Sequence, residues 1–112
     1  MKISDDTKGD VAIIKLEGKV MGGPDATTFH GKLYEMVNAG RKKVIVDLGK
    51  VDWMSSVGLG MLISALTTMK NNQGELRLAN VTKSIESLLT ITRLVTIFKT
   101  FDSIDEAIAS FE

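Results

Sequence analysis

A short run of aliphatic and β-branched residues, Val44 to Leu48 (VIVDL), limits the possible folds of this chain more than any other segment. Such a run is typical of a strand at the centre of a parallel sheet, where both faces are buried. Parallel neighbours need crossover connections, which are usually helices. The rest of the sequence should therefore alternate between short strands and amphipathic helices.

Two strands and one helix are predicted before this run. A weak strand near Lys2–Thr7 turns at Gly9 into a stronger, more apolar strand at Val11–Leu16, and we expect the two to form a hairpin. Pro24 suits the first turn of a helix, where its missing N–H needs no partner. Gly40 is expected to end this helix. Its apolar residues recur on one face: Phe29, Leu33, Met36 and Val37.

The second half of the chain continues the alternation. A second helix is expected from Gly58 to about Asn71–Gly74, and Leu76–Ala79 (LRLA) is the next strand. The apolar face of that helix consists of Leu59, Leu62, Ile63, Leu66 and Met69. A third helix is predicted from Lys83, and the residues that indicate it are Ile85, Leu88, Leu89 and Thr92.

The last strand and the last helix are short. Ile97 and Phe98 predict the final strand. A capping box follows, in which the Ser103 hydroxyl accepts the amide N–H of Glu106 while the Glu106 side chain reaches back. The order β-β-α-β-α-β-α-β-α predicts an α/β fold, a mixed and largely parallel sheet of four to five strands with about four helices. The loops at the carboxyl ends of its strands are the expected functional edge.

Composition narrows the classes of function. The 14 basic and 14 acidic residues cancel, so no net positive field attracts nucleic acid or an anionic membrane. The chain has no cysteine and a single histidine, His30, which leaves no disulfide and no structural zinc site to expect. No segment approaches the ~20 apolar residues of a membrane span. We therefore expect one domain over residues 1–112, soluble and cytoplasmic, with no cofactor and no direct contact with nucleic acid.

The segment VDWMSSVGLG, residues 51–60, follows the central strand and is expected at the carboxyl edge. Either Ser55 or Ser56 could cap the next helix by accepting a free backbone N–H. Gly58 and Gly60 each disfavour the first helical turn by about 1 kcal/mol relative to alanine, so another requirement must hold them there. Close packing of helix against strand is one explanation, and backbone left open for a partner is the other.

A helix start of this kind is also a favourable place for a phosphate group. The first N–H groups and the positive end of the helix dipole stabilise negative charge. A phosphoserine there would add a charge of about −1.5 to −2 to the surface without unfolding the domain. The segment is therefore a candidate for a reversible phosphorylation switch.

Other signals for chemistry are weak. Gly58-Leu59-Gly60 lacks the third glycine of a dinucleotide fingerprint, and the lysine and hydroxyl residue of a P-loop are missing. His30 has no evident partner for nucleophilic or metal chemistry and is interpreted as a solvated side chain. Trp53 is expected in the core because it follows a buried strand, with a partner contact as the alternative. The basic run Arg41–Lys43 follows a helix C-terminus, where cations offset the dipole.

The segment VDWMSSVGLGMLI resembles the signature of the STAS domain, the sulfate transporter and anti-sigma factor antagonist family. The family pattern is an apolar or aromatic pair followed by Asp, Ser, Ser or Thr, Gly, Leu and Gly. Aligned on the glycines, Ser55 stands at the family's Asp, Ser56 at the phosphorylated serine and Val57 at the second hydroxyl residue. The resemblance extends over the Gly18 turn, VIVDL, GELRLANV and ITRLVTIF to the last helix. The chain departs from it at Ser55 and at MGGPDA, which replaces a more acidic stretch.

The resemblance implies a partner-switching function. The unphosphorylated protein would bind an anti-sigma factor that is also an ATP-dependent serine kinase, and would so release a sigma factor. Phosphorylation of Ser56 would end this binding, and a serine phosphatase would restore it. The domain would then be a kinase substrate and not an enzyme. The residues implied in partner binding are Gly22, Gly23, Ser55, Ser56, Val57 and Gly58.

Two other functions remain as alternatives. A STAS-type adaptor that regulates another signalling protein without phosphorylation is compatible with the missing carboxylate at Ser55. A small nucleotide-binding hydrolase would use the glycine-rich edge, although the sequence offers it no candidate base or metal ligand.

Overall fold

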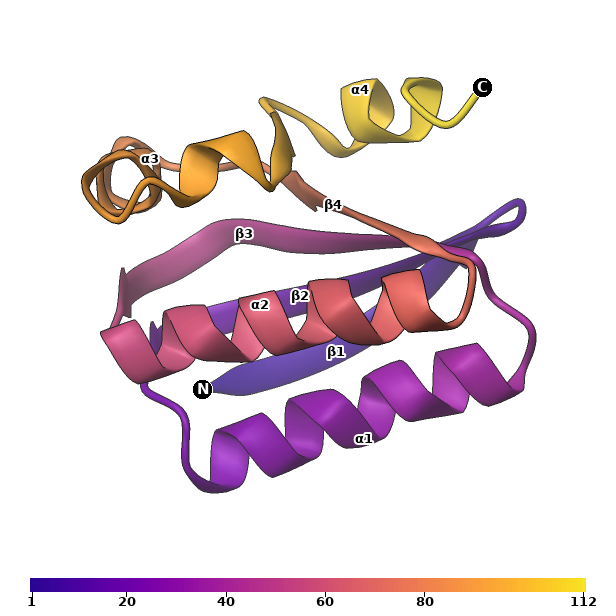
Figure 1. Ribbon diagram of the computed structural model, residues 1–112, viewed down its shortest axis with the longest axis horizontal. Helices are drawn as coiled ribbons and strands as arrows, with labels where there is room; N and C mark the ends of the chain where they lie inside the picture. The colour runs from indigo at the N-terminus through magenta and orange to yellow at the C-terminus, as the bar shows by residue number, and fades with distance from the viewer.

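The computed structural model describes every residue from Met1 to Glu112, and its strands and helices alternate along the chain (Figure 1). The strands are β1 (Lys2–Lys8), β2 (Val11–Val20), β3 (Lys43–Met54), β4 (Glu75–Ala79) and β5 (Lys99–Phe101). The helices are α1 (Pro24–Asn38), α2 (Ser56–Asn71), α3 (Lys83–Ile91) and α4 (Ile104–Ala109), with a 3-10 turn, η1, at Leu94–Thr96. None of these helices is both long and apolar enough to cross a membrane.

All five strands lie in one sheet in the order β1-β2-β3-β4-β5. β1 and β2 form an antiparallel hairpin, and every later pair of neighbours is parallel. β3 is central, and its residues Val44–Leu48 are all buried. The predicted α/β class, the mixed sheet and the four helices are therefore confirmed. Because β2 to β5 run in one direction, their last residues lie at one edge, the carboxyl edge, and their first residues lie at the amino edge.

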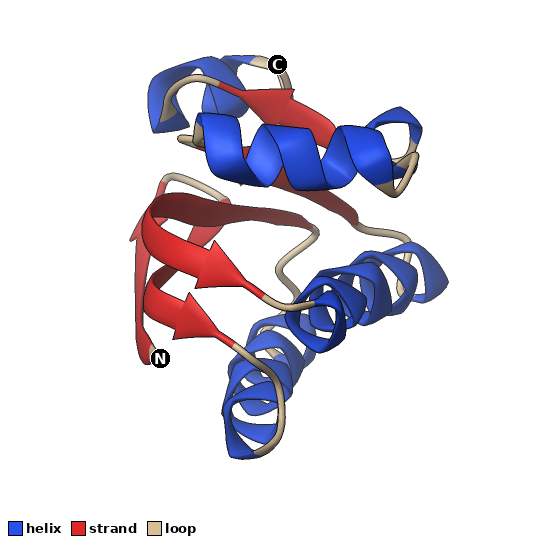
Figure 2. Ribbon diagram, turned by 90° about the vertical axis from the view of Figure 1, so that its left-hand side faces the viewer, coloured by secondary structure: helices blue, strands red, loops and turns tan.

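Helices cover both faces of the sheet, and Figure 2 shows them in two groups separated by the strands. α1 and α2 contribute to the larger core on one face. α4 covers part of the other face, where Ala107 belongs to a smaller core with Ile45. Successive residues of β3 alternate between the two cores, so Val46 lies in the larger one. Burial from both sides explains why this strand is an unbroken apolar run up to Asp47.

β3 carries two bulges where it pairs with β2, one between Asp47 and Lys50 and one between Val51 and Trp53. At each bulge β3 contains one residue more than the facing segment of β2. An extra residue interrupts the alternation of side chains between the two faces and increases the local twist. The buried residues in the carboxyl half of β3 consequently recur at every third position: Leu48, Val51 and Met54.

Two predicted boundaries need correction. The last strand does not form at Ile97 and Phe98, because these residues follow the 3-10 turn η1 (Leu94–Thr96) and β5 begins at Lys99. Phe98 is buried in the larger core, so its apolar character reflects packing and not a strand. α2 begins at Ser56, two residues before the predicted start at Gly58.

The cap predicted for α4 is present. The Ser103 hydroxyl accepts the amide N–H of Glu106 at 3.1 Å. The Glu106 carboxylate reaches back and accepts the N–H of Asp102 at 3.3 Å. These two bonds fix the start of a helix that is only six residues long.

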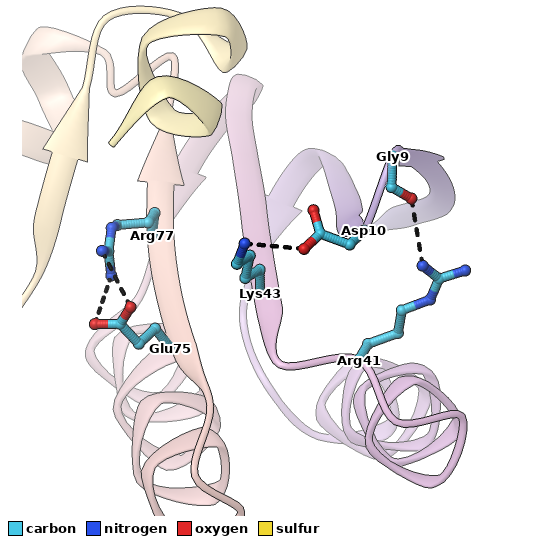
Figure 3. A network of polar contacts seen from close by, with 6 residues as sticks. All are labelled: Gly9, Asp10, Arg41, Lys43, Glu75 and Arg77. Atoms are coloured by element: carbon cyan, nitrogen blue, oxygen red, sulfur yellow. Dashed lines mark hydrogen bonds and ion pairs between the residues drawn. The ribbon is translucent and has the colours of Figure 1, made fainter. Parts of the chain in front are cut away.

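Polar contacts close the amino edge of the sheet (Figure 3). Lys43 forms an ion pair with Asp10 at 2.9 Å, and Arg41 donates to the β1–β2 turn at 3.5 Å. The hydrogen bond and charge of Lys43 hold the pKa of the Asp10 carboxyl below its usual range. Lys42 Nζ donates to the backbone carbonyl of Asn72, just after α2, at 2.6 Å. The three basic residues thus have a structural role, although not the predicted one at the C-terminus of α1: Arg41 and Lys43 bind the β1–β2 turn, and Lys42 binds the end of α2.

Candidate functional site

The predicted site lies at the carboxyl edge, where β3 ends at Met54 and α2 begins at Ser56. Val20, the last residue of β2, is the register partner of Met54. The β2–α1 loop, residues 21–23, therefore starts beside the beginning of α2. Two segments far apart in the sequence form this edge together, because Ser55 and Met21 share a hydrogen bond across 34 positions.

Ser55 is the N-cap of α2. Its hydroxyl oxygen accepts the N–H of Gly58 at 3.0 Å and donates to the carbonyl oxygen of Met21 at 3.3 Å. Its backbone N–H donates to the carbonyl oxygen of Val20 at 2.9 Å. Of the two serines that could cap the helix, Ser55 does so, and its hydroxyl is used both as a donor and as an acceptor.

Ser56 is the first residue of α2, and it is exposed. Its hydroxyl makes no hydrogen bond to the protein, in contrast to that of Ser55. The backbone amides of Ser56 and Val57 also lack an acceptor within the protein, as is normal in a first helical turn. A phosphate on Ser56 would meet these amides and the positive end of the helix dipole.

The two glycines of this turn have different surroundings. A Cβ atom on Gly58 would collide with the carbonyl oxygen of Val20, because α2 packs directly on the end of β2. A Cβ atom on Gly60 would meet nothing within 4 Å, and Gly60 is exposed. Close packing therefore explains Gly58, whereas Gly60 leaves backbone open at the surface.

The β2–α1 loop contains two glycines with positive φ, 86° at Gly22 and 65° at Gly23, a conformation that favours glycine. Gly22 is buried, and a Cβ atom there would lie 2.5 Å from Cγ1 of Val57. Gly23 is exposed with open space around it. Of the residues predicted to bind a partner, Gly22 and Gly58 thus hold the edge together from inside, while Gly23, Ser56 and Val57 are exposed at its surface.

Three large apolar side chains are also exposed at this edge. Val57 is 63% exposed, Met21 52% and Trp53 47%. Isolated exposed apolar residues are normal, but these three gather near the start of α2. Trp53 and Val57 lie three positions before and one position after Ser56, and the carbonyl group of Met21 is hydrogen-bonded to the neighbouring Ser55. We define the docking surface as Met21, Trp53, Ser56 and Val57.

The prediction that Trp53 lies in the core is wrong. The bulge between Val51 and Trp53 shifts the alternation, so Val51 and Met54 are buried while Trp53 is half-exposed. The only signal in the sequence is the spacing of three between Leu48, Val51 and Met54, which a regular strand would not show. Sequence reasoning also missed Met21, whose position follows from the bond between its carbonyl group and Ser55.

No acid or base activates the free hydroxyl. No histidine or carboxylate is hydrogen-bonded to Ser56 in the way that a catalytic serine requires. His30 lies half-buried on α1, with its ring centroid 5.7 Å from that of Phe29 and 6.5 Å from that of Tyr34. No group of three or more histidine, aspartate and glutamate side chains could hold a metal ion.

Curated relatives match this chain over most of their length. BtrV of Bordetella bronchiseptica, a proposed anti-sigma factor antagonist, is 29% identical over 112 residues, which cover 100% of this chain and 96% of BtrV. A proposed anti-sigma factor antagonist of Thermotoga maritima is 28% identical over 99 residues, covering 88% of each chain.

Solved structures have the same fold. The crystal structure of a proposed anti-sigma factor antagonist from Thermotoga maritima has a TM-score of 0.86 at 24% identity and covers 96% of this chain and 92% of its own. SpoIIAA from Bacillus in its phosphorylated form has a TM-score of 0.77 at 15% identity and covers 99% and 100%. The family model described as the STAS domain matches residues 2–107. The chain therefore belongs to the STAS domain family.

Proposed function

We propose that this protein is an anti-sigma factor antagonist that binds its partner through the docking surface and is released by phosphorylation of Ser56. Two relatives similar over most of the chain carry the same assignment, which supports the first part. SpoIIAA, an anti-sigma factor antagonist with this fold, has been solved in unphosphorylated and phosphorylated forms. The second part rests on the geometry of two adjacent serines.

The observation that carries the proposal is the difference between Ser55 and Ser56. The Ser55 hydroxyl is bound on both sides, so a kinase would have to break the helix cap to reach it. The Ser56 hydroxyl is exposed and free at the same helix start. Ser56 is thus the better acceptor, in agreement with its alignment on the phosphorylated serine of the family pattern.

The apolar side chains beside Ser56 supply the means of binding. Half-exposed tryptophan and methionine side chains are frequent anchors in protein interfaces, and Trp53 and Met21 have this character. Val57 follows Ser56 directly and is the most exposed of the three. A partner that covers these side chains would also enclose the Ser56 hydroxyl, so a phosphate there would fall inside the interface.

A phosphate on Ser56 should affect the interface far more than the fold. Within the domain the charge meets a helix N-terminus, which is stabilising by about 0.3–1 kcal/mol. In the interface the same charge would lose water, at a cost on the order of several kcal/mol. The switch would therefore act on binding while the domain stays folded.

Partner switching completes the cycle. The anti-sigma factor would be a serine kinase that binds the unphosphorylated protein, releases its sigma factor and later phosphorylates Ser56. A serine phosphatase would return the protein to its binding form. The protein itself would act by binding, in the cytoplasm where sigma factors work, without contact to nucleic acid or membrane.

One observation favours a second candidate function, that of an adaptor for another signalling protein. Ser55 occupies the position of the family's aspartate, so the acceptor lacks an adjacent carboxylate. A kinase that requires this carboxylate would not modify Ser56. The docking surface would then serve a partner without a phosphorylation step. By contrast, the nucleotide-binding hydrolase has little support, because Gly58 packs against β2 instead of facing a ligand.

Phosphopeptide mapping with the partner kinase tests the proposal. Incubation with the kinase and ATP should place the phosphate on Ser56, and Ser56→Ala should abolish incorporation. Ser64→Ala is the matched control, since Ser64 is an exposed serine on the same helix, and it should leave incorporation unchanged. Incorporation that survives in Ser56→Ala but is lost in Ser55→Ala would overturn the assignment. A partner that binds but adds no phosphate would support the adaptor instead.

A further inference from the structure

Ser55 differs from every other residue that caps a helix in this protein. Thr82 caps α3 and Ser103 caps α4, and each accepts one N–H from its own helix, at 3.3 Å and 3.1 Å. Neither hydroxyl donates to another segment. The Ser55 hydroxyl accepts from its own helix and in addition donates to Met21, 34 positions earlier in the chain. The additional bond therefore does more than start the helix.

The loop that receives this bond has one other backbone hydrogen bond, from the N–H of Ala26 in α1 to the carbonyl oxygen of Gly23, at 3.0 Å. Gly22 and Gly23 have positive φ, and glycine has more backbone freedom than any other residue. The amides of Met21, Gly22 and Gly23 donate no hydrogen bond within the protein. Gly22 touches the Val57 side chain, and the carbonyl of Met21 is bound by Ser55.

We propose that Ser55 is a positioning residue, whose hydroxyl holds the Met21–Gly23 loop against the start of α2 and so fixes the shape of the docking surface around Ser56. The link needs a group that accepts and donates at once, as a hydroxyl does. An ionised carboxylate at this position would still cap the helix but could not donate, and it would repel the carbonyl oxygen of Met21. The choice of serine thus determines whether the loop is fixed or free.

Three substitutions separate the link from the cap. Ser55→Thr keeps the donor and the acceptor, Ser55→Asp keeps the acceptor alone, and Ser55→Ala removes both. Backbone order parameters from NMR relaxation of the full chain report the loop. We expect values of about 0.85 at Gly22 and Gly23 in the wild type and in Ser55→Thr, and values below about 0.6 in Ser55→Asp and Ser55→Ala.

Ser55→Asp is the decisive variant because aspartate is as good an N-cap as serine, so the order parameters of α2 should stay near those of the wild type. A loop that loosens while α2 stays rigid supports the positioning role. Unchanged order parameters at Gly22 and Gly23 in Ser55→Asp would overturn it. Loosening throughout α2 in Ser55→Asp would also overturn it, since the hydroxyl would then serve only the helix.

The binding role of the docking surface rests on the proposed function, and a second measurement tests whether Ser55 affects that binding. With the anti-sigma factor kinase as probe, Ser55→Ala should raise the KM for phosphorylation of Ser56 about tenfold, an effect of about 1.4 kcal/mol, with kcat little changed. Ser55→Thr, which keeps the hydroxyl, should have the wild-type KM. An unchanged KM together with a loosened loop would show that the loop does not contact the partner. If the kinase fails to bind the wild type, the proposed function is wrong, and the relaxation data still decide the role of Ser55.

Discussion

The two edges of the sheet are built in opposite ways. At the amino edge the charged side chains are paired, with Lys43 on Asp10 and Lys42 on the carbonyl group after α2. At the carboxyl edge, large apolar side chains of Trp53 and Val57 are exposed beside a free hydroxyl. A surface that stays in water gains from satisfied polar groups, whereas an interface core is apolar and poor in charge. The fold thus closes one edge by itself, and under the proposed function a partner covers the other.

The largest expected effect on stability comes from the packing contact between α2 and the end of β2 at the carboxyl edge. Gly58→Ala should lower the free energy of unfolding by about 1–3 kcal/mol, because its methyl group would collide with the Val20 carbonyl. Gly60→Ala, two residues along the same helix, should raise it by up to about 1 kcal/mol, since alanine favours a helix and the space is open. Urea unfolding of both variants measures the difference. Equal effects of the two substitutions would contradict the assignment of packing to Gly58 alone.

The next effect concerns the apolar part of the docking surface. Trp53→Ala should weaken partner binding by about 2 kcal/mol, or roughly thirtyfold, as truncation of an interface anchor typically does. Tyr34→Ala is the matched control, because Tyr34 is exposed to a similar extent, 52% against 47%, but lies toward the far end of α1. Surface plasmon resonance with the immobilised anti-sigma factor compares them. A loss at Tyr34 as large as that at Trp53 would move the interface away from the carboxyl edge.

The smallest expected effect is at the amino edge and depends on pH. Because Lys43 lowers the folded-state pKa of Asp10, the pair contributes stability that is present above the unfolded-state pKa. This contribution is lost as the pH falls through the lower, folded-state value. Lys43→Met should therefore lose stability at neutral pH and show a flatter loss of melting temperature below about pH 4. The effect should be small because the pair is exposed. Identical pH profiles for Lys43→Met and wild type would show that this ion pair does not stabilise the fold.

The helices and most strands could be predicted because their signals are local. Apolar spacing on α1 and the capping box of α4 depend only on residues within a few positions of each other. The carboxyl half of β3 could not be predicted in this way. Its bulges depend on how β3 aligns with β2, and a single extra residue moves Trp53 from the predicted core to the surface.

The position of the candidate site could be predicted from the sequence, but the separate roles of its two serines and two glycines could not. The serines and glycines of residues 55–60 mark a helix start at the carboxyl edge from sequence alone. Which serine caps the helix depends on the approach of Met21, and which glycine is packed depends on the position of Val20. Both contacts come from a segment more than 30 positions away, as the separation of 34 between Ser55 and Met21 illustrates.

A charge on Ser56 is expected to act on the interface and not on the fold. Calorimetric titration of the anti-sigma factor with the unphosphorylated and the Ser56-phosphorylated protein, together with thermal melting of both forms, tests it directly. The phosphorylated form should bind at least about a hundredfold more weakly, a loss of roughly 2.8 kcal/mol or more, while its melting temperature stays equal or rises slightly. Equal affinity of the two forms, or weaker binding accompanied by a large fall in melting temperature, would contradict a surface switch at Ser56.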